Sequence, residues 1–268
     1  MSDGPTPQAM IEFEDVHRSF HGQRVLRGVD LSILEGETFT ILGGSGSGKS
    51  VCLKHMTGLL KADSGCVRMF SEDITRLPEH RLIPVRKAAS MIFQSAALFD
   101  SLNVYENVAY PLREHRRWPE QRTAARVAEC LEAVGLTGVE FKMPAELSGG
   151  MRKRVGVARG IALEPAAILY DEPTTGLDPA NQRRIGELIR SLQQRLGVTS
   201  VIVTHELELC FAISDRVALL KRGRIAAMGS ATEIHESENS DVVAFLAGVH
   251  QQTDDEAVVT GEEDRDGT

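Results

Sequence analysis

The residues Thr38–Ser50, with the sequence TFTILGGSGSGKS, indicate the fold most clearly. The first five, Thr38–Leu42, are apolar or β-branched, as is typical of a short strand that is buried on both faces. A glycine-rich stretch follows, and from Lys49 to Leu59 the pattern predicts a helix. A strand, a glycine-rich loop and a helix in this order predict an α/β domain with a parallel sheet.

The glycine-rich loop matches the pattern GxxxxGK[ST], which binds phosphate for a physical reason. Its glycines let the backbone curl so that several N–H groups point at one phosphate, and the following helix adds the positive end of its dipole. Lys49 is expected to bridge the β- and γ-phosphates of a nucleotide, and the Ser50 hydroxyl to ligate Mg²⁺. A flexible glycine turn is the structural alternative, but the position between a strand and a helix argues against it. The predicted nucleotide-binding residues of the loop are Gly43, Gly44, Ser45, Gly46, Ser47, Gly48, Lys49 and Ser50.

Two carboxylates end a second apolar strand, Ala166–Tyr170. In a parallel sheet such strand ends gather at one edge, so Asp171 and Glu172 are expected beside the phosphate loop. Asp171 fits a carboxylate that holds Mg²⁺, and Glu172 fits the base that polarises the attacking water. A strand-end turn before Pro173 is the structural alternative for the pair taken alone. The chain has no NKxD motif for reading guanine, which argues against a GTPase.

A third motif, Leu147-Ser148-Gly149-Gly150, lies between the other two. A serine and two glycines that open a helix form an anion site at the helix N-terminus, although alone they would be an ordinary N-cap. With this motif in place, the sequence resembles the ABC ATPase family over nearly all of residues 11–246. The resemblance implies that Ser148, Gly149 and Gly150 close over the γ-phosphate that a second copy of the chain binds.

The same resemblance implies roles for four further residues. Phe20 lies where an aromatic ring stacks on adenine, although alone it would be read as a core residue on a strand face. Gln94 resembles the glutamine that senses Mg²⁺ and the attacking water, and Asp178 resembles a residue of the dimer-contact loop. His205 resembles the histidine that contacts the γ-phosphate. The predicted catalytic residues are therefore Glu172, His205, Gln94 and Lys49, and the predicted metal ligands are Ser50, Gln94 and Asp171.

The family fold implied by this resemblance is α/β: a P-loop NTPase cassette with a RecA-like core, an N-terminal antiparallel β subdomain and an inserted helical subdomain. We expect a flexible N-terminus at residues 1–10, an ATP-binding domain at 11–246 with its helical part at about 97–163, and an acidic, disordered tail at 247–268. Alternating apolar residues predict antiparallel strands at Ile11–Phe20 and Val25–Leu34. A helix is predicted at Val104–Ala109, stopping at Pro111.

Composition and charge narrow the classes of partner. The 268 residues are 42% hydrophobic and 25% charged, as in ordinary globular proteins, and no window holds the roughly 18 apolar residues of a membrane helix. The N-terminus lacks the features of a secretory signal, so a role at a membrane is expected to come through partner subunits. The net charge of −8 is concentrated in the tail, which leaves the body nearly neutral and argues against nucleic-acid binding. The four cysteines lack CxxC spacing, which favours reduced thiols over a disulfide framework or a zinc site.

The segment from Gln94 to His115 is similar to the Mla-type phospholipid transport ATPases. That resemblance implies a homodimer that acts with an integral membrane permease, an MCE-type lipid-binding protein and a small regulatory subunit, on the cytoplasmic face of the inner membrane. It implies ATP and Mg²⁺ as cofactors and intermembrane phospholipid traffic as the function. Residues 96–99 are expected to form an apolar groove for the permease, with a packed lobe as the alternative. The arginines between Arg113 and Arg126 fit either lipid head groups or a solvated helix face.

Three other functions remain open at this point. An ABC ATPase for another solute, such as an amino acid or a metal complex, would carry the same motifs. A soluble ABC ATPase that acts on DNA or ribosomes usually has a long coiled-coil insertion or two cassettes, and neither fits in 268 residues. A module that holds nucleotide without turnover would not need Glu172 and His205. The departures from the family pattern, Gly44, Met151 and Tyr170, remove no catalytic group, so an active ATPase is expected.

Overall fold

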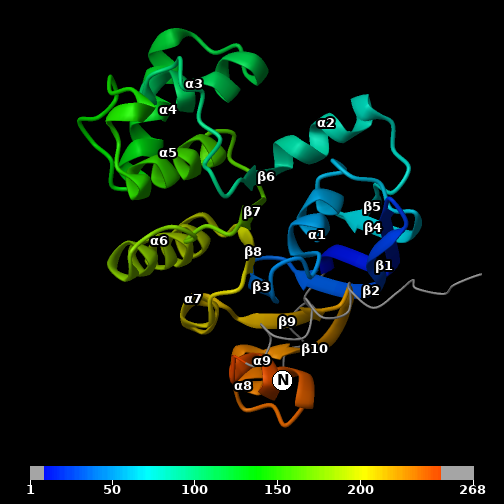
Figure 1. Cartoon of the computed structure of the whole chain (residues 1–268). Coiled ribbons are helices and arrows are strands. Elements are labelled where there is room, and N and C mark those ends of the chain that lie inside the picture. The colour runs from blue at the N-terminus through cyan, green and yellow to red at the C-terminus, as the bar shows by residue number, and fades with distance from the viewer. Residues whose placement is uncertain (1–8, 249–268) are drawn as a thin grey trace, which may run out of the picture.

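A six-stranded mixed sheet forms the centre of the protein (Figure 1). The computed structural model describes residues 9–248. The strand order is β10-β9-β3-β8-β7-β6, and every strand except β10 runs parallel to its neighbours. The strands are β3 (Thr38–Leu42), β6 (Ala89–Ile92), β7 (Ala167–Asp171), β8 (Thr199–Thr204), β9 (Arg216–Lys221) and β10 (Arg224–Ser230). β3, β7 and β8 are buried along their whole length, which explains their continuous apolar and β-branched sequences.

A second, antiparallel sheet has the order β2-β1-β4-β5. Its strands are β1 (Ala9–Phe20), β2 (Gln23–Leu34), β4 (Ser64–Met69) and β5 (Glu72–Asp73). β1 and β2 are joined by a turn in which His21 and Gly22 both have positive φ. β1 begins at Ala9, so Ala9 and Met10 belong to a strand and not to a flexible N-terminus as expected. Residues 1–8 lie outside the described residues.

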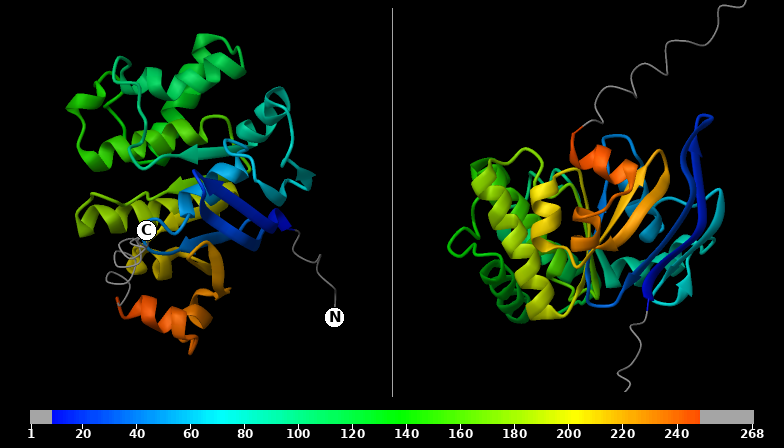
Figure 2. Two further views of the ribbon diagram at one scale, coloured as in Figure 1. Left: turned by 45° about the vertical axis from the view of Figure 1, so that its right-hand side comes forward. Right: turned by 90° about the horizontal axis from the view of Figure 1, so that it is seen from below.

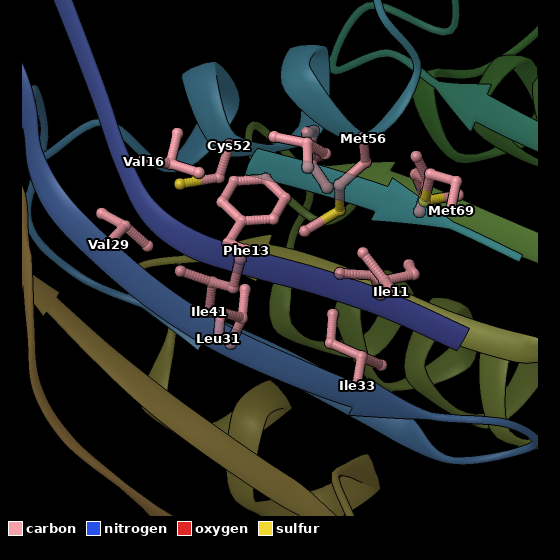
Figure 3. Close-up of a cluster of buried hydrophobic side chains, with 14 of the residues drawn as sticks. Ile11, Phe13, Val16, Val29, Leu31, Ile33, Ile41, Cys52, Met56 and Met69 are labelled. Atoms are coloured by element: carbon pink, nitrogen blue, oxygen red, sulfur yellow. The ribbon is translucent and has the colours of Figure 1, made fainter. Parts of the chain in front are cut away.

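Helix α1 (Lys49–Met56) lies between the two sheets and joins them into one core. Figure 3 shows its side chains Cys52 and Met56 facing Phe13 and neighbouring apolar residues of the antiparallel sheet. The same core includes Ile41 of β3, so it continues into the central sheet. This packing fixes the start of α1, and therefore the loop before it, relative to the ends of the central strands.

Helices cover the other face of the central sheet, opposite the antiparallel sheet (Figure 2). Three of them, α3 (Val104–His115), α4 (Glu120–Ala133) and α5 (Gly149–Ile161), pack on one another as a helical group that follows β6 in the chain. α2 (Glu79–Ala88) leads into β6, and α6 (Pro179–Leu196) packs on β8. The α/β fold class, with its antiparallel sheet and inserted helices, is confirmed.

The expected end of a helix before Pro111 is wrong, because α3 continues to His115. A proline inside a helix removes one backbone hydrogen bond and costs about 3 kcal/mol. Val108 and Ala109 before Pro111, and Leu112 after it, are fully buried against the helical group. Their burial outweighs the missing bond, so packing and not local propensity decides where the helix ends.

The last described residues form a small lobe against β9 and β10. It consists of α7 (Leu207–Ile213), α8 (Ala231–His235) and α9 (Ser240–Leu246), and a 3₁₀ turn (Pro144–Glu146) precedes α5 elsewhere in the fold. The expected acidic tail lies outside the described residues from position 249 onward. Within residues 9–248, no helix has the length and apolar character needed to cross a membrane.

Candidate functional site

The loop Gly43–Ser50 connects the carboxyl end of β3 to the first residue of α1. Two of its glycines are required by geometry. A Cβ on Gly43 would lie 2.5 Å from the backbone oxygen of Leu220, and Gly48 caps α1 with φ +105°. The loop therefore follows a tight path that other residues cannot take, with its exposed turn at Ser45 and Gly46.

The ammonium group of Lys49 is buried at the base of this loop, with only 6% of the side chain exposed. It donates hydrogen bonds to the backbone oxygens of Gly43 and Gly44, both at 2.9 Å. The Oε1 atom of Glu172 lies 3.3 Å from it. A buried cation of this kind attracts anions strongly, because the low local dielectric weakens screening. The arrangement fits a nucleotide phosphate.

Ser50 and Asp171 meet across the sheet edge. The Ser50 hydroxyl donates a 2.7 Å hydrogen bond to Oδ1 of Asp171, whose side chain is 9% exposed. Within residues 9–248 no cluster of three or more His, Cys, Asp or Glu residues forms a metal cage. A hydroxyl and a carboxylate suit Mg²⁺, which takes oxygen ligands and usually keeps water and substrate phosphates as the others. The residues present therefore fit Mg²⁺ bound together with a nucleotide.

Glu172 has its carboxylate held by several neighbours. Its Oε2 atom lies 2.9 Å from Nδ1 of His205 and accepts a 3.2 Å hydrogen bond from the Thr175 hydroxyl, while Oε1 faces Lys49. Its φ of +48° lies in the left-handed region, where residues other than glycine are uncommon. Backbone strain of this kind is concentrated at functional sites. The His205 side chain is 53% exposed and so stands at the open side of the site.

Gln94 and Phe20 lie at the edges of this group. Gln94 is exposed in the turn after β6, two residues beyond Ile92, which pairs with Tyr170 of β7. It therefore lies at the same sheet edge as Glu172, but within the described chain its side chain makes no hydrogen bond. Phe20 ends β1, and the guanidinium of Arg18 lies 4.7 Å from its ring centre.

The turn Ser148-Gly149-Gly150 begins α5 within the helical group. Ser148 is exposed and caps the helix by accepting a hydrogen bond from the Met151 amide at 3.2 Å. A Cβ on Gly150 would meet Asn181 at 3.3 Å, so the turn lies close to the start of α6. Asp178 caps α6 by accepting hydrogen bonds from the Ala180 and Asn181 amides, and these bonds, the Asn181 amide first, lower the pKa of its carboxyl.

The structure thus divides the predicted residues into two sets. The loop residues with Asp171, Glu172 and His205 form one cluster through direct contacts. Ser148, Gly149, Gly150 and Asp178 form a second set where α5 and α6 begin, and Figure 1 shows these two helices apart from α1. Within the described chain, no hydrogen bond joins the second set to the phosphate loop. The roles assigned to all of these residues stay predictions.

Two basic residues that contact the site region carry no role in the sequence-based prediction. Lys153 of α5 donates to the backbone oxygens of Thr175 and Glu172. Arg159 donates to the backbone oxygens of Ala96 and Ala97 at 2.9 and 2.8 Å. Their acceptors are backbone atoms of distant segments, so no local pattern could identify the pairs. The one sequence feature that could have drawn attention to Lys153 is its position four residues after Gly149, which puts both residues on one face of α5.

A groove with a cavity volume of about 510 Å³ runs between α2, β6 and the helical group. Phe93, Phe99 and Tyr110 line it and are each 38–44% exposed, and the centres of the Phe99 and Tyr110 rings lie 4.8 Å apart with the ring planes tilted by 49°. Of the residues expected to form the groove, Ala97 and Phe99 line it. Ala96 is buried instead, and it packs so closely on Gly156 of α5 that an added Cβ there would lie 3.1 Å from the Ala96 Cβ.

Comparison with known proteins gives consistent results. The sequence profile of the ABC transporter family matches residues 26–175. The intermembrane phospholipid transport system ATP-binding protein MlaF of Escherichia coli K12 is 39% identical over 240 residues, which is 90% of this chain and 89% of MlaF. The methionine import ATP-binding protein MetN of Rhizobium etli is 39% identical over 256 residues, which is 94% of this chain and 71% of MetN.

Among solved structures, a dimeric, post-hydrolysis state of the ATP-binding cassette MJ0796 bound to ADP and Pi is similar to this chain. The TM-score is 0.76 at 31% sequence identity, and the match covers 83% of this chain and 99% of the other. The similarity therefore extends over both the central sheet and the helical group.

Proposed function

The chain belongs to the ABC transporter family and is an ATP hydrolase, and from this premise we propose that two copies bind ATP between them and drive intermembrane phospholipid transport. The observation that carries the shared site is the separation of the two clusters. Ser148 is exposed at the start of α5, and within residues 9–248 no hydrogen bond joins it to the phosphate loop of its own chain. An exposed helix N-terminus favours anions, and in a dimer of two copies the phosphate that the partner binds is the anion that can reach it.

The chemistry follows from the contacts of the first cluster. Lys49 binds the β- and γ-phosphates, and Ser50 and Asp171 hold Mg²⁺, which would neutralise phosphate charge in the transition state. Glu172 accepts a proton from the attacking water, and His205 keeps the Glu172 carboxylate oriented through the 2.9 Å contact. Gln94, at the same sheet edge, lies where it can report the state of the site to the helical group.

We assign the remaining predicted residues to the shared site in the same way. Phe20 stacks on adenine, supported by its place at the end of the hairpin whose residue Val25 packs on Gly48. Asp178 contacts the second copy beside the signature turn. In the partner's site, Ser148, Gly149 and Gly150 close over the terminal phosphate. ATP thereby joins two surfaces that otherwise lack a contact, and hydrolysis releases them.

Two observations support a membrane permease as the partner. The groove exposes three aromatic rings in a continuous cavity, which suits the apolar face of a short helix. Two lining residues of the groove, Phe93 and Ala97, flank Gln94 in the chain, so a bound helix would lie close to the catalytic edge of the sheet. We place the chain on the cytoplasmic face of the inner membrane, with the permease in this groove and an MCE-type protein and a small regulatory subunit in the same complex.

The lipid substrate is supported by the relative MlaF and by the resemblance of residues 94–115 to the Mla-type ATPases. The similar identity to the methionine importer supports the second candidate, import of another solute. The test is purification of the complete complex from membranes, followed by analysis of bound lipids and of ATPase rates with added phospholipid or methionine. Co-purified phospholipid and a rate that rises with phospholipid would support the first candidate. A rate that responds to methionine alone would overturn it.

A further inference from the structure

We propose that Lys153 is a positioning residue for hydrolysis: it holds the backbone of Glu172 and so links the Ser148-Gly149-Gly150 turn of a chain to the catalytic base of the same chain. This inference rests on the proposed function. It adds a connection between the two nucleotide sites that runs inside one copy, from α5 to the loop after β7.

The contact joins α5 to the loop that carries Glu172. The Lys153 ammonium donates to the backbone oxygen of Thr175 at 2.8 Å and to that of Glu172 at 3.3 Å. One helical turn earlier, the position of Gly149 faces Leu177 at 3.6 Å. The same face of α5 therefore touches the loop at both of its ends, with the lysine bridging the residues that begin it.

Glu172 needs such support, because its backbone is strained. With φ at +48°, it keeps its conformation only while neighbours fix it. Its N–H donates to the backbone oxygen of Val203 at 3.0 Å, and its own oxygen accepts from the Thr175 amide at 3.4 Å and from Lys153 at 3.3 Å. The Val203 bond ties Glu172 to β8, the Thr175 bond lies within its own loop, and the Lys153 bond ties it to α5. Without the Lys153 bond, the loop loses this hold on α5, and Glu172 can relax toward ordinary backbone angles and turn its carboxylate away from the site.

The surroundings of Lys153 strengthen the bond. The side chain is partly buried, and burial lowers the pKa of its ammonium while the carboxylates of Glu206 and Glu172 oppose that effect. A charged donor in a partly desolvated place forms stronger hydrogen bonds than an exposed one. Lys153 therefore holds α5 and the loop after β7 at a fixed distance from one another.

The functional consequence follows from where α5 begins. Its first residues are the turn that we assign to the partner's nucleotide, and Lys153 lies one turn further along the same rigid helix. If α5 shifts when its Ser148-Gly149-Gly150 turn binds a phosphate, the hydrogen bonds of Lys153 would move the backbone oxygen of Glu172 with it. Each site would thus align the base of the other only when both hold ATP.

The test compares Lys153→Met with the matched control Arg154→Met in the complete complex. Arg154 is the next basic residue on α5 and also donates to backbone oxygens, those of Val134 and Gly135 at the end of α4. We expect Lys153→Met to lower kcat by about 10- to 100-fold, as loss of a charged hydrogen bond to a catalytic element does, with KM for ATP within about twofold. Arg154→Met should leave both values near those of the parent.

A double variant separates positioning from a general structural role. If Lys153 acts through Glu172, adding Lys153→Met to Glu172→Gln should lower kcat no further. An equal further loss in the double variant, an unchanged kcat in Lys153→Met, or an equal loss in Arg154→Met would overturn the proposal. If thermal unfolding shows that Lys153→Met does not fold, Lys153→Gln, which keeps a polar group but no charge, is measured by the same criteria. A parent rate in Glu172→Gln alone would instead contradict the assigned base, which distinguishes the two failures.

Discussion

The Glu172 carboxylate contacts more of the predicted catalytic residues than any other side chain of the site. Its carboxylate contacts Lys49, Thr175 and His205, and it lies beside the carboxylate that binds Ser50. Replacing it with glutamine keeps the shape and removes the proton acceptor. We expect Glu172→Gln to lower the rate of ATP hydrolysis by about 10²–10⁴-fold while ATP binding stays intact. Steady-state phosphate release and equilibrium binding of ATP measure the two quantities.

The control is Glu187→Gln, which makes the same change at an exposed position of α6. It should hydrolyse ATP at the parent rate. A parent rate in Glu172→Gln as well would show that another group accepts the proton.

His55 is predicted to make stability depend on pH. It is buried in α1, its Nδ1 lies 2.7 Å from the Val51 oxygen, and burial lowers the pKa of its ring, with Arg18 adding to the effect. Above about pH 6.5, the usual histidine pKa, the ring is neutral in both folded and unfolded chains. Below that value the His55 ring takes up a proton in the unfolded chain but stays neutral in the folded chain. The free energy of unfolding therefore falls by about 1 kcal/mol per pH unit until the pH reaches the pKa of His55 in the folded chain.

The measurement is urea unfolding between pH 5.5 and 8 for the parent and for His55→Gln, which can still bond to the Val51 oxygen. The parent should lose more stability than the variant on the acid side, because other titrating groups are common to both. Parallel pH profiles would show that His55 does not titrate differently on unfolding.

Individual site residues were predictable from the sequence where each follows a strand. Asp171 and His205 end or follow β7 and β8, and the loop from Gly43 follows β3, so the parallel sheet brings them together. The positive φ of Glu172 and the contact of Lys153 were not predictable in this way. Both depend on the path of a loop relative to a helix from another part of the chain, and no local propensity encodes that relation.

At the scale of elements, Asn107 is predicted to hold the start of the helical group. Its side chain is fully buried, accepts from the Phe99 amide, and donates to the oxygens of Phe99, Leu102 and Asn103. Asn107→Ala leaves these groups without their partner, so we expect the free energy of unfolding to fall by about 2–3 kcal/mol. Chemical unfolding of the purified protein measures this change.

Asn103→Ala provides the comparison within the same helix. It removes the N-cap of α3, which accepts from the Glu106 amide, and should cost about 1 kcal/mol. An Asn107→Ala cost at or below that of Asn103→Ala would mean that water replaces the lost bonds and that Asn107 does not fix the groove-lining segment.

The lengths of the elements show where sequence-based prediction fails. Strands were predictable because alternating or continuous apolar residues record their burial directly, as in β3 and β8. The end of α3 was not predictable, because Pro111 is a local signal for stopping while Leu112 is buried in a core that the helical group shares with α6 and the central sheet. Tertiary packing decides such conflicts, and the contacts that decide them are known only from the three-dimensional arrangement of the neighbouring helices.

At the scale of the whole molecule, we propose residues 11–246 as one ATP-binding domain, with its helical part at about 97–163. The two copies are predicted to associate only with ATP present and hydrolysis blocked. Glu172→Gln with ATP should therefore dimerise, whereas Glu172→Gln combined with Ser148→Arg should not, because a bulky cation replaces the small cap. Sedimentation measures both, and dimerisation of the double variant to the same extent would contradict a shared site.

The most direct measurement is an experimental structure of the assembled complex carrying Glu172→Gln and ATP. We predict that the Ser148 hydroxyl and the Gly150 amide of one copy lie within hydrogen-bonding distance, about 3 Å, of the phosphate held by Lys49 of the other copy. If those groups lie far from every bound nucleotide, the two copies do not share their sites.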